Sequence, residues 1–154
     1  MFKPFAAALF AAALTLSASA YDAQQAKVLD AVYSKFDQTA CANSKLFISA
    51  EDTMQMLRDK KDFLLLDVRT EGEAAVIALT TDNSLHIPLQ NLFKPESLEQ
   101  LPTDKPIIVV CHSGVRATMA AMGLKQAGIK MTHVLKGGMV ALADANNPKN
   151  APLK

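Results

Sequence analysis

Several residue clusters that define a function are missing from this sequence of 154 residues. It has no run of lysine or arginine and a net charge of +1, which argues against nucleic acid as a partner, because neutralising phosphates takes clustered cations. Its three histidines, His86, His112 and His133, lack the spacing of metal ligands, so no metal is predicted. No glycine-rich turn with a lysine resembles a phosphate loop. We therefore expect a protein without a cofactor.

The remaining composition is that of one ordinary domain. Apolar residues make up 50% and charged residues 20%, so a hydrophobic core can form and wholesale disorder is excluded. The length fits one domain with a short appendage.

The first twenty residues have the layout of a secretory signal peptide. Lys3 precedes 12 apolar residues, 5–16, and small residues then end at Ala20, which predicts cleavage before Tyr21. The alternative is an uncleaved membrane anchor, but the apolar run would rise only about 18 Å as a helix, less than a hydrocarbon core of ~30 Å. No later stretch is long enough to span a bilayer, so we expect a periplasmic or secreted protein.

The mature chain alternates helix-like and strand-like segments. Residues 22–39 repeat apolar side chains at helical spacing, which predicts an amphipathic helix that covers the protein's own domain or docks onto a partner. A loop follows, and strands are then predicted in "LFIS", "DFLLLDVR", "SLHIPL", "IIVVC" and "MTHVLKGG". Helices are predicted after Ser49, from Gly114 or Val115 to about Ala127, and in "MVALADA". The pattern predicts a signal peptide (1–20), an N-terminal helix and loop (21–44) and an α/β domain with a mostly parallel sheet (45–150).

Cys111 ends the segment with the strongest strand pattern. Ligands of parallel α/β sheets bind at the carboxyl ends of strands, so the thiol is expected at a binding site. Gly114 allows a tight turn, the backbone N–H groups of a loop that opens a helix can converge on an anion, and Arg116 adds a permanent charge. These features favour a thiolate. In the alternative, Cys111 is a small core residue. His112 either binds an anion or accepts protons, or is simply an exposed loop residue.

Four segments resemble the single-domain rhodanese sulfurtransferases in order and spacing, over about residues 45–145: "FLLLDVRTEGE", "HIPL", "DKPIIVVCHSGVRATMAAMGLKQAGI" and "VLKGGM". The resemblance implies a three-layer α/β fold with a five-stranded, mostly parallel sheet flanked by helices. It implies that Cys111 takes a sulfane sulfur from thiosulfate, polysulfide or a persulfide, holds it as a persulfide and passes it to a thiophilic acceptor. The residues implied to form the persulfide cradle are His112, Ser113, Gly114, Val115 and Arg116.

The resemblance also gives supporting roles to Asp67, Arg69 and Glu73. Asp67 and Arg69 match the family's "DVR" segment and would buttress the site, and Glu73 matches an acidic position that can pair with Arg69. The alternative is an ordinary surface ion pair, worth under ~1 kcal/mol.

The sequence departs from the family at two places. Residues 79–84, "LTTDNS", lack the glycines and the histidine of the usual "GHIPGA"-like segment, which puts the local geometry in question. Arg116 is the only permanent cation of the loop, whereas many members that use thiosulfate carry another. This disfavours doubly charged thiosulfate as the donor and favours a polysulfide or a low-molecular-weight persulfide.

Two other functions compete with sulfur transfer. Cysteine phosphatases and related arsenate reductases use a loop with seven members, whereas Cys111 to Arg116 spans six, which suits sulfur better than a tetrahedral oxyanion. A redox-switched carrier or non-catalytic binding module would arise if Cys41 came within about 7 Å of Cys111 in Cα separation, because a disulfide would block the persulfide. Otherwise Cys41 is a free thiol or pairs between molecules. Expected partners are small sulfur-containing anions, thiol or cyanide acceptors and, through the N-terminal helix, a protein sulfur acceptor or a second copy.

Overall fold

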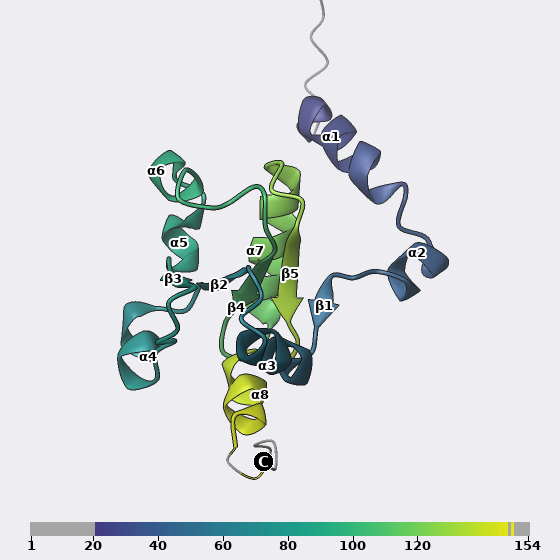
Figure 1. Cartoon of the computed structure of the whole chain (residues 1–154). Coiled ribbons are helices and arrows are strands. Elements are labelled where there is room, and N and C mark those ends of the chain that lie inside the picture. The colour runs from purple at the N-terminus through teal and green to yellow at the C-terminus, as the bar shows by residue number, and fades with distance from the viewer. Residues whose placement is uncertain (1–20, 148, 150–154) are drawn as a thin grey trace, which may run out of the picture. The chain divides into compact units, whose positions relative to one another are not determined.

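The computed structural model describes residues 21–147 and residue 149, so the predicted signal peptide lies outside the described residues. The chain divides after Asn43 into two compact units, whose elements are labelled in Figure 1. No helix in the described part of the chain is both long enough and apolar enough to cross a membrane.

The N-terminal unit contains two helices, α1 (Ala23–Tyr33) and α2 (Gln38–Ala42). The prediction of one helix over residues 22–39 is therefore wrong. The periodic pattern runs across a turn, where the Phe36 ring packs back on Tyr33 with 5.9 Å between ring centroids. Asp37 then begins α2, because its side chain accepts the Ala40 N–H at 2.7 Å. As a result Cys41 lies in a helix and not in the predicted loop.

The C-terminal unit is built on a five-stranded sheet in which every strand pair is parallel. In space the strands follow the order β1-β5-β4-β2-β3. Their bounds are β1 (Phe47–Ile48), β2 (Leu64–Asp67), β3 (Ser84–His86), β4 (Ile107–Val110) and β5 (Thr132–Leu135). The fold class predicted from the sequence is confirmed.

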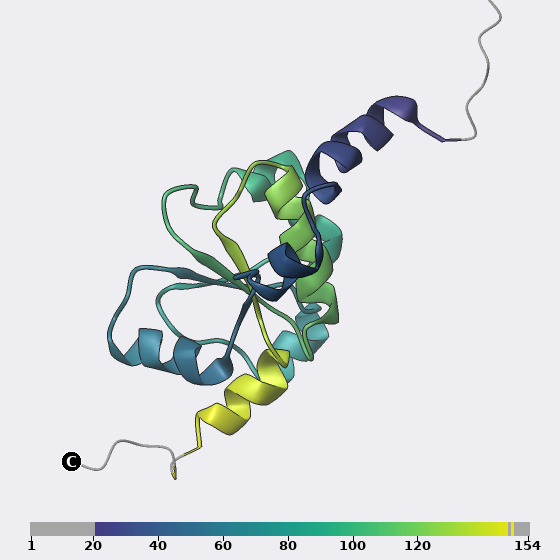
Figure 2. The same cartoon turned by 90° about the vertical axis from the view of Figure 1, so that its right-hand side faces the viewer.

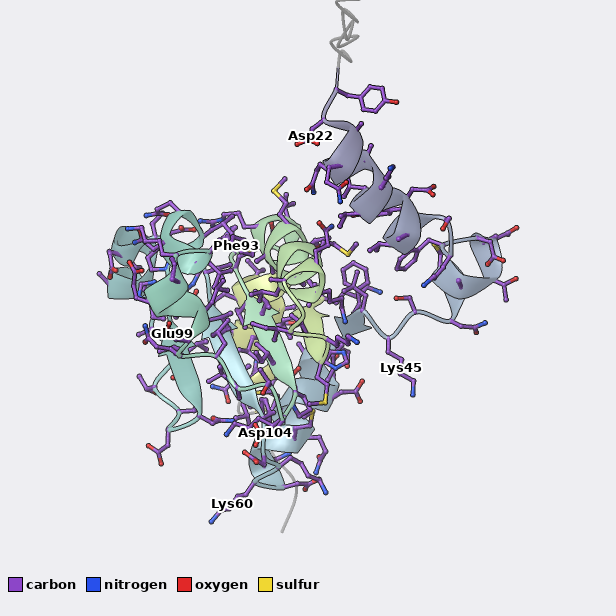
Figure 3. All side chains as sticks on the ribbon, turned by 90° about the horizontal axis from the view of Figure 1, so that it is seen from above. Asp22, Lys45, Lys60, Phe93, Glu99 and Asp104 are labelled. Carbon is purple, nitrogen blue, oxygen red and sulfur yellow. The ribbon has the colours of Figure 1, made fainter. Side chains whose placement is uncertain are left out.

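Helices cover both faces of this sheet, as Figures 1 and 2 show. One face carries α3 (Ala50–Arg58) and α8 (Gly138–Ala145), and the other carries α5 (Leu89–Leu92), α6 (Pro95–Leu98) and α7 (Val115–Gln126). Neighbouring residues of the central strands point to opposite faces: Leu65 and Ile108 pack toward α3 and α8, while Leu66 and Val109 pack toward α7. Side chains fill the space between the layers (Figure 3).

Local signals explain most helix boundaries in this unit. The Ser49 side chain accepts the Asp52 N–H at 3.0 Å and begins α3 as predicted. Gly128, with a φ of 98°, follows the end of α7 as predicted. The sequence reading missed α4 (Glu71–Val76), although Thr70 and Glu73 form a capping box at its start. This helix holds a side chain of the candidate site.

Candidate active site

Cys111 directly follows β4, at the edge of the sheet where the carboxyl ends of the strands meet. Gly114 has a φ of 109°, and this left-handed conformation turns the chain into α7 with its amides toward the sulfur. The Gly114 N–H donates to Cys111 Sγ at 3.1 Å and the Ala117 N–H at 3.4 Å. Both donors lie at the N-terminal end of a helix, where partial positive charge stabilises an anion. The arrangement stabilises negative charge on the sulfur.

The Cys111 residue is fully buried. Burial alone also fits the alternative of a small core residue. The two converging backbone donors distinguish Cys111 from a core thiol, because they are placed to hydrogen-bond an anionic group carried on the sulfur, and such bonds are roughly twice as strong as bonds to a neutral acceptor. No part of Cys111 is exposed, so the residues packed around the loop of residues 111–116 cover the sulfur in this conformation.

A second helix N-terminus holds this loop from its other side. The Met139 N–H donates to the Cys111 carbonyl oxygen at 2.7 Å, and the Val140 N–H donates to the His112 carbonyl oxygen at 3.2 Å. The approach requires glycine at position 138, where φ is 60° and an added Cβ would lie 2.6 Å from the His112 oxygen. Gly138 therefore lets α8 touch the backbone of the loop.

Arg116 binds Glu73, so the predicted pairing of Glu73 with Arg69 is wrong. Arg116 Nη1 and Nη2 donate to the two Glu73 oxygens at 2.7 and 2.6 Å. The capping box of α4 fixes Glu73 for this pairing, since the Thr70 N–H donates to Glu73 Oε2 at 3.0 Å. Arg116 first, and then Thr70, hold the pKa of the Glu73 carboxyl well below its usual range. Glu73, with a smaller contribution from Cys111, raises the pKa of Arg116.

Asp67 and Arg69 form a second ion pair, and this one is buried. The Arg69 backbone N–H, Nε and Nη2 donate to the Asp67 carboxylate over distances of 2.6 to 3.1 Å. The Arg69 Nη2 also donates to the Ile77 carbonyl oxygen at 2.7 Å, and His86 Nε2 lies 2.9 Å from the Arg69 carbonyl oxygen. The alternative of an ordinary surface pair is therefore wrong. The pair ties the end of β2 to β3 and to the segment after α4.

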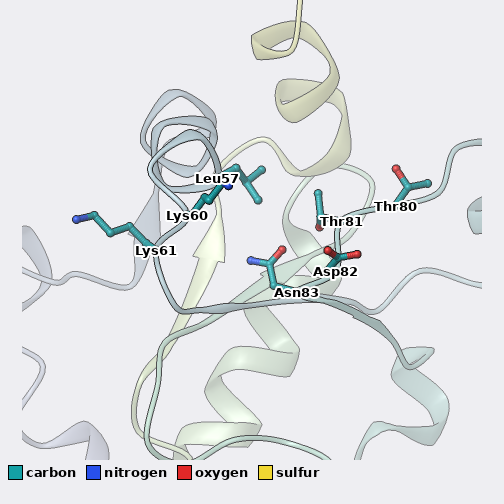
Figure 4. Close-up of a pocket in the computed structure, with 7 residues that line it drawn as sticks. All are labelled: Leu57, Lys60, Lys61, Thr80, Thr81, Asp82 and Asn83. Carbon is teal, nitrogen blue, oxygen red and sulfur yellow. The ribbon is translucent and has the colours of Figure 1, made fainter.

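Residues 79–84, where the sequence departs from the family, are held by polar side chains in place of glycines. Asn83 Nδ2 donates to the Phe63 carbonyl oxygen at 3.1 Å, and Ser84 Oγ donates to the Thr81 carbonyl oxygen at 2.7 Å. Next to them, a pocket of about 530 Å³ separates this segment from the end of α3 (Figure 4). It lies by the amino end of β2, at the edge of the sheet opposite Cys111, and so does not belong to the site.

A pocket of about 310 Å³ lies beside the Cys111 loop and between α4 and α8; we call it the loop-side pocket. Its lining includes His112, Val76, Ile77, Met139, Val140 and Ala143. Of the predicted cradle residues, His112, Ser113 and Val115 are exposed, Gly114 is buried and Arg116 is half-buried. His112, which directly follows Cys111 in the chain, is thus the loop residue that lines this pocket.

The structure brings together Cys111, its loop, Asp67, Arg69 and Glu73, all at one edge of the sheet in the C-terminal unit. Cys41 belongs to the N-terminal unit, and both cysteines are free thiols. Sequence reasoning missed the Ala117 amide, which lies one residue beyond the predicted cradle, and the contact that α8 makes at Gly138. The paired glycines after the last strand were the available signal for that contact.

The six-residue loop from Cys111 to Arg116 places the chain in a class of protein, the α/β domains with a cysteine at the carboxyl edge of a parallel sheet. A family model described as rhodanese-like domain matches residues 49–145, and the chain belongs to this family. A sulfurtransferase from Allochromatium vinosum is 32% identical over 105 residues, which cover 68% of this chain and 94% of that protein.

Solved structures agree with this assignment. A rhodanese-like domain protein from Staphylococcus aureus is 26% identical, with a TM-score of 0.55 over 62% of this chain and 89% of that one. A rhodanese-related protein from Thermoplasma volcanium is 28% identical, with a TM-score of 0.54 over 66% of this chain and 93% of that one. The rhodanese-like fold is therefore confirmed, and relatives named as sulfurtransferases support a role in sulfur transfer.

Proposed function

We propose that the protein is an exported, periplasmic or secreted sulfurtransferase that carries sulfur as a persulfide on Cys111. The Cys111 thiolate attacks the sulfane sulfur of a donor, the sulfur–sulfur bond of the donor breaks, and the leaving group departs with the electron pair. An acceptor thiolate or cyanide then attacks the outer sulfur and restores the Cys111 thiolate. The cycle needs no external oxidant or reductant, because each step exchanges one sulfur–sulfur bond for another bond to the same sulfur.

One observation carries this proposal: the Gly114 and Ala117 N–H groups converge on Cys111 Sγ. Persulfide sulfur is anionic when ionised, and fixed donors aimed at a developing charge stabilise it without reorganisation. A core cysteine would gain little from two such donors. Loss of turnover in Cys111→Ala, measured as thiocyanate formed from polysulfide and cyanide, is the expected result. Unchanged turnover in that variant would refute the proposal.

The pairing of Arg116 supports a polysulfide or persulfide donor over thiosulfate. Both of its terminal nitrogens are bound by Glu73, so the loop's permanent positive charge is already compensated by a carboxylate. A doubly charged donor would gain little attraction there. We expect kcat/KM for polysulfide to exceed that for thiosulfate, and a clear excess for thiosulfate would overturn this assignment of the donor.

Export and the role of Cys41 have separate tests. N-terminal sequencing of protein recovered from the periplasm or medium should begin at Tyr21, and an intact N-terminus would refute cleavage. The competing function is a redox-switched carrier, in which a disulfide between Cys41 and Cys111 would block the persulfide. Cys41 is an exposed free thiol and so is accessible for such a reaction. The test of this function is Cys41→Ser, which removes the only intramolecular partner of Cys111.

A further inference from the structure

The loop-side pocket is apolar where it meets solvent. Val76 is 81% exposed, Val140 55% and Ile77 53%, and together with Met139 and Ala143 they form its wall. Its volume of about 310 Å³ is at the small end of the range for ligand sites, enough for an aromatic ring or a short alkyl chain. Exposed apolar side chains gathered around a concavity mark a surface that gains free energy when an apolar group covers it.

The charged residues of this pocket are already paired. Glu73 is bound by Arg116, and Arg69 is bound by Asp67 and by the Ile77 carbonyl oxygen. Neither side chain offers a free charge to a ligand, and the remaining polar lining residue is His112. The pocket, which reaches the Cys111 loop at His112, therefore suits the organic group of a donor that carries a single negative charge.

We propose that the loop-side pocket binds the organic group of a monoanionic sulfane-sulfur donor and selects such donors over thiosulfate. The proposal rests on the proposed function and names its substrate class, organic persulfides and thiosulfonates. With a thiosulfonate, the Cys111 thiolate attacks the terminal sulfur, the bond between the two donor sulfurs breaks, and a sulfinate leaves with the electron pair. Two negative charges enter the step and two leave, on the persulfide and the sulfinate.

Two thiosulfonates with the same reacting group provide the test. Benzenethiosulfonate carries a ring for the pocket, and methanethiosulfonate carries only a methyl group. The rate of sulfur addition to Cys111 is followed by intact mass, and each rate is divided by the rate of that donor with a free thiol in solution. Covering about 60 Å² of apolar ring corresponds to a factor of about ten, so we expect a normalised ratio near ten. A ratio near one would overturn the proposal.

Variants of the wall locate the effect. Val140→Asp puts a carboxylate into the wall while its position near the start of α8 favours a negative charge. We expect it to bring the ratio close to one. Val76→Asp, on the opposite wall in α4, should do the same. The control is Met131→Asp, an exposed apolar residue just before β5 at the far edge of the sheet, which should keep the ratio. An undiminished ratio in both wall variants would refute the pocket.

The charge argument is tested with Glu73→Gln. Glutamine keeps an acceptor for the capping box but no longer compensates the charge of Arg116. Loading by thiosulfate relative to methanethiosulfonate should rise several-fold, and no rise would contradict selection by charge. Polysulfide needs no pocket, so its loading of wild type and wall variants reports on sulfur transfer alone. If no donor, polysulfide included, adds sulfur to Cys111, the proposed function itself fails; if polysulfide loads and the ratio is one, only the pocket fails.

Discussion

Replacing Asp67 by asparagine should destabilise the domain strongly, although it removes no volume. The side chains of Asp67 and Arg69 are 3% and 4% exposed, so the variant leaves a guanidinium charge buried. Loss of one partner of a buried pair costs about 3 to 5 kcal/mol. We expect about 3 kcal/mol, the lower end, because the Ile77 carbonyl and the new amide oxygen still accept from Arg69. With an m-value of about 2 kcal/mol/M, the urea midpoint should fall by about 1.5 M.

Asp62→Asn provides a matched control just before the other end of the same strand, β2. Asp62 pairs with Lys105 at 2.9 Å, but its side chain is 80% exposed. Exposed pairs contribute at most about 1 kcal/mol, so this variant should shift the midpoint by less than about 0.5 M. Equal, small shifts in the two variants would show that Asp67 and Arg69 behave as a surface pair. That result would refute their role in anchoring the site.

Three further predictions concern the same edge of the sheet. Arg116 is the chief cause of the lowered pKa of the Glu73 carboxyl in the folded state, so this group contributes stability that is present above its ordinary pKa of 4.5 and lost as the pH falls below it. The free energy of unfolding measured in urea should therefore fall from pH 5 toward pH 2, and it should fall less in Glu73→Gln. Parallel pH profiles for the two proteins would contradict the pairing. Gly138→Ala should lower the free energy of unfolding by about 2 kcal/mol or more, because φ at this position is 60° and an added Cβ would clash with the loop carbonyls. Gly72→Ala in α4, where an added Cβ would meet nothing within 4 Å, should instead raise the free energy of unfolding by about 0.5 kcal/mol. Urea midpoints measure both changes, and equal effects would refute the close approach of α8. Cys41→Ser should leave the transfer rate without reductant unchanged, and a marked rise would instead indicate a blocking disulfide.

The sheet and the position of the thiol could be predicted because their signals are local and strong. Apolar runs such as those of β2 and β4 are typical of strands buried on both faces. Parallel strands bring their carboxyl ends to one edge, so the residue after the best strand had to lie there. Ser49 and Gly128 marked helix ends through chemistry within three residues of each position.

The details that failed depend on contacts between segments far apart in the sequence. Glu73 is positioned by the capping box of α4, a short helix that the sequence pattern did not predict. Its partner, Arg116, lies 43 residues further along the chain. Gly138 matters through backbone atoms of the Cys111 loop, and a residue pattern says nothing about such atoms. The helix predicted over residues 22–39 was too long because Tyr33 and Phe36 are three residues apart, a spacing that also occurs on one face of a helix. In the structure their rings pack on each other across a turn.

Intact mass spectrometry of the purified mature protein, before and after incubation with polysulfide or an organic thiosulfonate, tests the central claim most directly. The account predicts a gain of one sulfur atom, about 32 Da, that cyanide removes and that is absent in Cys111→Ala. The account would be contradicted if no sulfur were added, or if the same gain occurred in Cys111→Ala. A mass two protons light that reductant restores would point to a disulfide between Cys41 and Cys111 and to a redox-switched carrier.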